Sequence, residues 1–154
     1  MSVIIGLTAA SVLVSTMLVW HFAIQAGLGG SAAGIALLSI PIMLLFGFLV
    51  AAICGYMAGL IGSSNSPISG VGILAVVGCS VFLLIFFAGS PDKALAAVAL
   101  FITSILFAAA CSSNDNLQDL KTGQLVGATP WRQQVALVYG VIFGSLVIPP
   151  ILNT

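Results

Sequence analysis

Charged residues are almost absent from this chain. Only 4% of its 154 residues are charged, three basic and three acidic, and the formal net charge is zero. A water-soluble globular domain carries charge on about a quarter of its residues, so that class is excluded. So few cations also leave no electrostatic surface for nucleic acid. The mean hydropathy of +1.31 instead indicates an integral membrane protein, with the lipid bilayer as its first partner.

Motifs for catalysis and for metal or cofactor binding are also missing. The cysteines Cys54, Cys79 and Cys111 lie in separate apolar runs without Cys-x-x-Cys spacing, which fits neither a disulfide framework nor a zinc site. The sequence contains no nucleophile paired with a base, no glycine-rich phosphate loop and no metal-ligand spacing. We therefore expect neither an enzyme nor a bound cofactor or metal, and we interpret the cysteines as packing residues.

Long apolar runs make up most of what is present. A membrane-spanning helix needs about 20 mostly apolar residues, and the chain offers five runs of that kind. We predict an all-α protein, a polytopic transmembrane helical bundle that forms a single region over residues 1–154. Its helices are expected at approximately 3–27, 35–61, 70–89, 94–113 and 130–149.

The first predicted helix carries a polar stripe. At a step of 100° per residue, an arc of about 140° contains Thr8, Ser11, Ser15, His21 and Gln25. Such a stripe is expected to face other protein or a water-filled path rather than lipid. The imidazole of His21 can gain and lose a proton near neutral pH, which makes it a candidate for proton coupling. The alternative is a packing histidine that is held by a hydrogen bond.

A polar segment interrupts the hydrocarbon between the second and third runs. From Gly59 to Gly70 it reads Gly-Leu-Ile-Gly-Ser-Ser-Asn-Ser-Pro-Ile-Ser-Gly. Glycine and serine allow the backbone to leave the helix at a point where a solute could bind. Two interpretations stay open, an ordinary interfacial turn around Pro67 and a re-entrant or unwound segment that lines a path.

The segment 114–133 holds four of the six charged residues, which are Asp115, Asp119, Lys121 and Arg132. We expect a loop there, and its basic residues favour the cytoplasmic side of the membrane. Five crossings would then place the N-terminus in the cytoplasm as well. Asp115 and Asp119 are four residues apart, which would put both on one face of a helix. They are either solvated charges or, when enclosed by protein, candidate proton carriers.

Two segments resemble motifs of the oligopeptide transporter (OPT) family, in its prokaryotic branch. The first is residues 58–70, and the second reads Asn-Asp-Asn-Leu-Gln-Asp-Leu-Lys-Thr-Gly over 114–123, continues through 125–130 and ends at Gln133-Gln134. The resemblance implies secondary active transport of oligopeptides or, in a related branch, of metal chelates, driven by the proton gradient. The expected location is the cell membrane, as a multi-pass protein of the prokaryotic inner membrane.

By position in the first motif, the resemblance implies a substrate path lined by Ser63, Ser64, Asn65, Ser66 and Ser69. Asp115 and Asp119 match charged positions of the second motif. Together with His21 of the first helix, they are the candidates for proton coupling that the residues themselves offer.

Members of the family are several times longer than this chain. We therefore expect a fragment of a longer transporter, which needs the remaining helices or copies of itself as partners. The alternative is a small self-assembling membrane protein with a structural or regulatory role and no transport of its own.

Overall fold

The computed structural model describes residues 2–152, and every element in that range is helical. The elements in chain order are α1 (Ser2–Gln25), α2 (Ala32–Ile61), the short 3-10 helix η1 (Ser63–Asn65), α3 (Ile68–Phe86), α4 (Asp92–Leu125) and α5 (Pro130–Leu152). Each of the five long helices is long and apolar enough to cross a membrane. The expected all-α class and the five membrane segments are thereby confirmed.

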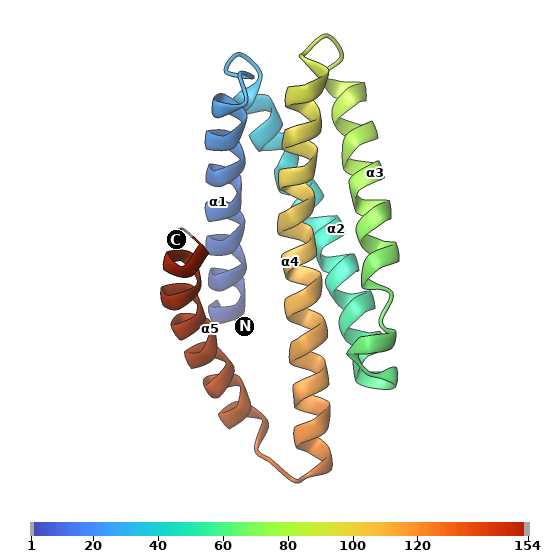
Figure 1. Cartoon of the computed structure of the whole chain (residues 1–154), viewed down its shortest axis with the longest axis vertical. Helices are drawn as coiled ribbons and strands as arrows, with labels where there is room; N and C mark the ends of the chain where they lie inside the picture. The colour runs from blue at the N-terminus through green and yellow to red at the C-terminus, as the bar shows by residue number, and fades with distance from the viewer. Residues whose placement is uncertain (1, 153–154) are drawn as a thin grey trace.

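The long helices alternate in direction, so that α2 and α4 run parallel to one another (Figure 1). The most extensive interface in the bundle joins these two helices, and α4 also packs against α1, α3 and α5. Within residues 2–152, α5 packs against no helix other than α4. The bundle is therefore organised around α4.

The apolar core fills the half of the bundle where α4 begins. Its fully buried side chains include Ile35 of α2, Leu83 of α3 and Ile102 of α4, and Phe22 of α1 stacks on Phe101 at 4.4 Å between ring centroids. A smaller cluster around Val50, Cys54 and Ala110 lies further along α2 and α4. Cys54 and Cys79 are buried with free thiols, in agreement with a packing role.

The fourth helix is longer than the sequence predicted. We expected an end at 113 and a loop over 114–133, and this prediction is wrong because α4 continues to Leu125 and only residues 126–129 connect it to α5. Polar side chains do not break a helix, and α4 contains no proline; the first residue after it with a left-handed backbone is Gly127, two residues beyond its end, with a φ of 73°. The other nine helix ends lie within three residues of their expected positions. The cytoplasmic location of this turn stays a prediction.

The register between α2 and α4 is fixed by close contacts. The hydroxyl of Ser113 donates a hydrogen bond of 2.8 Å to the carbonyl oxygen of Ala51. A Cβ atom on Gly55 would collide with that same hydroxyl, so glycine is what allows the approach. Because both helices rise by about 1.5 Å per residue, the stretch 51–61 of α2 lies level with 113–123 of α4.

The polar half of α4 is flanked by exposed apolar side chains. At this level Tyr56 of α2 is 67% exposed, and Val138 of α5, on the other flank, is 59% exposed. Such uncovered apolar surface is suited to the membrane rather than to water. Asn114 is eleven residues from the end of α4, about 17 Å along a helix of about 51 Å, whereas a bilayer with its headgroups measures about 40–45 Å.

The close approach of α2 and α4 predicts the effect of a single methyl group. We expect Gly55→Ala to lower the free energy of unfolding by about 1–3 kcal/mol, because the added Cβ displaces the Ser113 hydroxyl. Gly59→Ala on the same helix is the matched control, since its Cβ would meet no atom within 4 Å. Unfolding of the detergent-solubilised chain measures both variants, and equal stability would contradict this packing.

The depth assignment predicts how a spin label meets dissolved relaxing agents. With the native cysteines replaced by alanine, a nitroxide at Val138 is expected to collide with oxygen rather than with a water-soluble nickel complex, because this residue faces hydrocarbon. A nitroxide at Gly127, in the connecting turn, is expected to show the opposite preference. Collision of the Val138 label with the nickel complex in lipid vesicles would show that the polar half of α4 lies outside the membrane.

Candidate functional site

The candidate site lies where the chain leaves α2 and passes α4. Gly62 ends α2 with φ 85° and ψ 157°, η1 follows at once, and Ser66 is extended before α3 begins. A φ in this range is easily adopted only by glycine. The polar segment is thus a tight turn between two helices that are each long enough to cross the membrane. Since η1 contacts both α2 and α4, this turn is held against the polar half of α4.

Two serine hydroxyls, one from the turn and one from α4, donate hydrogen bonds to the same part of α2. Ser66 donates a hydrogen bond of 3.2 Å to the carbonyl oxygen of Cys54, and Ser113 donates to that of Ala51. Both acceptors lie on one turn of α2. We call this meeting point the polar junction, formed by the turn residues 63–66, by Ser113 and Asn114 of α4, and by these two carbonyl groups.

Asn114 is the buried polar side chain of the polar junction, with 2% of its surface exposed. Its amide nitrogen donates to the Asp115 carboxylate at 3.3 Å. Its buried oxygen Oδ1 accepts no hydrogen bond from any of the residues that the structure describes. Leaving such an acceptor unpaired costs about 1–3 kcal/mol, so a donor that reaches it would bind with that advantage.

Sequence reasoning did not single out Asn114. The neighbouring Asp115 and Asp119 were the more conspicuous candidates, because charged residues are rare in this chain. The available signal was the spacing to Ala110, which is four residues earlier and packs in the smaller apolar cluster. A side chain one helical turn beyond a buried one shares its face, and an asparagine on a buried face is costly unless it has a role.

The serines predicted to line a path do not all lie on one surface. Ser63 and Ser66 are half-buried in the polar junction, whereas Ser64 and Asn65 are exposed beside it. The Asn65 amide nitrogen donates at 3.3 Å to the carbonyl oxygen of Ile61, so part of this side chain holds the end of α2. Ser69 lines a separate groove between α3 and α4.

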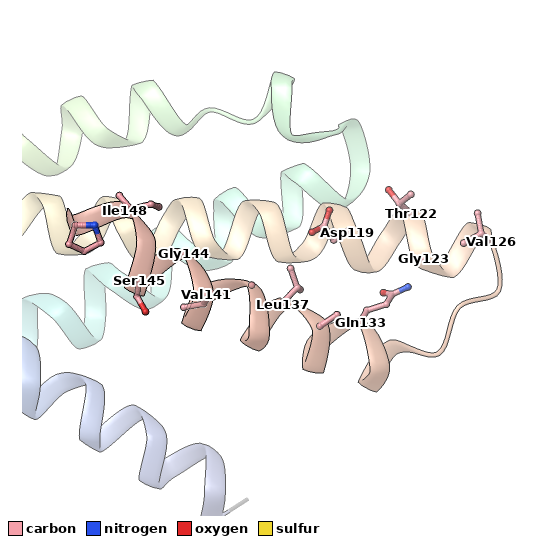
Figure 2. A pocket seen from close by; sticks show the side chains of 13 residues that line it. Asp119, Thr122, Gly123, Val126, Gln133, Leu137, Val141, Gly144, Ser145 and Ile148 are labelled. Carbon is pink, nitrogen blue, oxygen red and sulfur yellow. The ribbon is translucent and has the colours of Figure 1, made fainter. Parts of the chain in front are cut away.

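The two aspartates lie on the same side of α4 and are exposed. Asp115 adjoins the polar junction through Asn114, while Asp119, one turn further, lines a groove toward α5 (Figure 2). Lys121 does not pair with Asp119, because its Nζ donates to Gln124 Oε1 at 3.1 Å. The carboxylates therefore point toward different neighbours.

His21 lies far from both aspartates. It is exposed on α1 next to Phe22, which stacks on Phe101 of α4. Phe101 precedes Asn114 by thirteen residues, which is about 20 Å along the helix. The structure thus does not gather the three coupling candidates into one site, and within residues 2–152 no three side chains of His, Cys, Asp and Glu could jointly hold a metal ion.

Comparison with known proteins gives the family. The family model described as OPT oligopeptide transporter protein matches residues 1–154. A Haemophilus influenzae protein named "Putative oligopeptide transporter" is 56% identical over 114 residues, which cover 70% of this chain and 18% of that protein. The match therefore spans less than a fifth of that relative's length, and no solved structure shows significant similarity. Since the family model covers the whole chain, this protein belongs to the OPT family, a family of transporters and not of enzymes.

Proposed function

We propose that this chain is a segment of a secondary active transporter that moves oligopeptides, or related metal chelates, across the cell membrane. The observation that carries the proposal is the polar junction. There Ser66 of the first motif and Ser113, which directly precedes the second motif, are hydrogen-bonded to the same turn of α2, and Asn114 carries a buried, unpaired oxygen inside the helical bundle. Polar groups are expensive in this environment, and they typically mark the pathway of a solute.

The chemistry of the polar junction suits a peptide. A peptide backbone presents donors and acceptors in alternation, and hydroxyl and carboxamide side chains can serve as either. Ser63, Ser66 and Asn114 would therefore bind backbone groups without selecting a particular side chain. The break at Gly62 provides backbone that can rearrange beside the bound solute, as alternating access requires.

Proton coupling is the driving force that we propose. Asp115 is the nearest carboxylate to the solute position, because it accepts the amide hydrogen of Asn114. Carboxylates inside membrane helices are typical of proton relays, and Asp119 follows one turn later. His21 lies near the other end of α4, so any part it plays would be in a separate step.

Uncovered surfaces support the view that the chain is incomplete by itself. No residue of α5 is buried, and His21 and Gln25 of the α1 polar stripe are exposed. Membrane proteins cover such polar surface with other helices. Copies of this chain could also cover it, which is the self-assembling alternative.

The proposal predicts that replacing Asn114 impairs transport. In the complete transporter, Asn114→Leu is expected to reduce peptide uptake about tenfold or more, because leucine fills the space without offering a hydrogen bond of about 1–3 kcal/mol. Asn65→Leu is expected to act in the same direction. Asn116→Leu, at an exposed position two residues away, is the control and should leave uptake unchanged. If the Asn114→Leu variant inserts properly and takes up peptide at the wild-type rate, Asn114 serves in packing and does not contribute to transport.

A second prediction concerns the chain by itself. The purified 154-residue chain is expected to insert into liposomes but to show no proton-dependent uptake of di- to hexapeptides or metal chelates. The reason is that its helices leave the polar side chains His21 and Gln25 of the α1 stripe, and the whole of α5, without a covering wall. Uptake above that of empty liposomes would overturn the segment proposal, because the chain would then transport without the remaining helices.

A further inference from the structure

An open groove of about 970 Å³ runs between α4 and α5. One wall is the last part of α4 from Asp119 to Val126, and the other is the length of α5 from Gln133 to Pro149 (Figure 2). We call it the α4–α5 groove. Apart from its polar end, near Asp119 and Gln133, its lining is mostly apolar.

The polar end of the groove holds the exposed carboxylate of Asp119 and the side-chain amide of Gln133. The side chain of Gln133 lies against Gly123, where any Cβ atom would collide with it, and its Oε1 is buried without a hydrogen bond from the described residues. No hydrogen bond or ion pair within residues 2–152 reaches the Asp119 carboxylate. The nearby Thr122 hydroxyl donates its hydrogen bond to the carbonyl oxygen of Gln118, and not to Asp119 or Gln133.

The groove side of α5 combines small and bulky side chains. Ala136, Gly140 and Gly144 lie between Leu137, Val141 and Ile148, all of which line the groove. Small residues let helix backbones approach closely. A helix that enters the groove could therefore approach α5 at these positions and pack between the bulky side chains.

We propose that the α4–α5 groove is the docking site for a further transmembrane helix of the longer transporter, and that this helix brings a lysine, arginine or amide side chain to Asp119 and Gln133. The inference rests on the proposed function in one respect, that the chain is a segment. The Haemophilus relative has more than four fifths of its length outside the match, which leaves ample chain to supply the helix. Charge complementarity selects the donor, since Asp119 is acidic and the Gln133 oxygen accepts.

Other occupants fit the groove less well. A lipid chain has no donor for the two acceptors. A second copy bound symmetrically through the same groove would bring Asp119 toward Asp119 and acceptor toward acceptor, because a two-fold interface pairs each surface with itself. A helix of different sequence avoids both difficulties.

Photo-crosslinking in the complete transporter tests the docking site. Benzoylphenylalanine at Ala136, inside the groove, is expected to crosslink to a transmembrane peptide from outside this segment, identified by mass spectrometry. The same group at Val138, two residues away on the outer face, is the matched control and should reach lipid only. Crosslinks from Ala136 to a second copy of this segment, or to lipid alone, would overturn the proposal.

Charge substitution tests the donor. Asp119→Lys is expected to lower the Ala136 crosslink yield about tenfold, as cation then meets cation, while Asp119→Asn keeps an acceptor and retains most of the yield. An unchanged yield in Asp119→Lys would overturn the donor assignment. The crosslink is read without any uptake assay, so its failure refutes the docking site alone, whereas the transport proposal is tested separately by peptide uptake in the Asn114→Leu variant.

Discussion

The close approach of α2 to α4 is the constraint on which the rest of this structure depends. It exists because Gly55 has no side chain where the Ser113 hydroxyl comes in to reach the Ala51 carbonyl. Because the two helices are parallel and in this register, the turn after α2 lies beside the polar half of α4. Segments that are distant in sequence thereby share one location, and the absence of a side chain at Gly55 is one of the conditions for it.

Inside a membrane, hydrogen bonding separates structural polar groups from functional ones. Ser39, Thr103 and Ser113 each donate a hydrogen bond to a helix carbonyl oxygen, so their hydroxyl donors are satisfied. The oxygens of Asn114 and Gln133 are different, because they are buried and unpaired among the described residues. In hydrocarbon that state is costly. We therefore associate each oxygen with a molecule beyond this chain, a solute at the polar junction and a helix at the α4–α5 groove.

The helices were predictable from the sequence because hydrocarbon thickness fixes the length of an apolar run. The end of α4 was not, since hydropathy reports contact with lipid and not helix formation. The spacing of Asp115 and Asp119 was already that of a helix, so the residues carried the signal. The location of the polar turn was also evident from its composition. The burial of Asn114 and the separate position of Ser69 depend on helix rotation and register, which the local sequence does not encode, and the transport roles of the proposed residues stay predictions.

α4 also has a mechanical property. From Asp92 to Thr122 it contains neither proline nor glycine, the residues at which helices usually kink, so it behaves as one stiff rod. Its first half is packed in the apolar core against α1, α2 and α3, and Ser113 meets α2 beyond that core. A helix that does not bend carries this placement along its length, so the packing of its first half also fixes where its polar half lies.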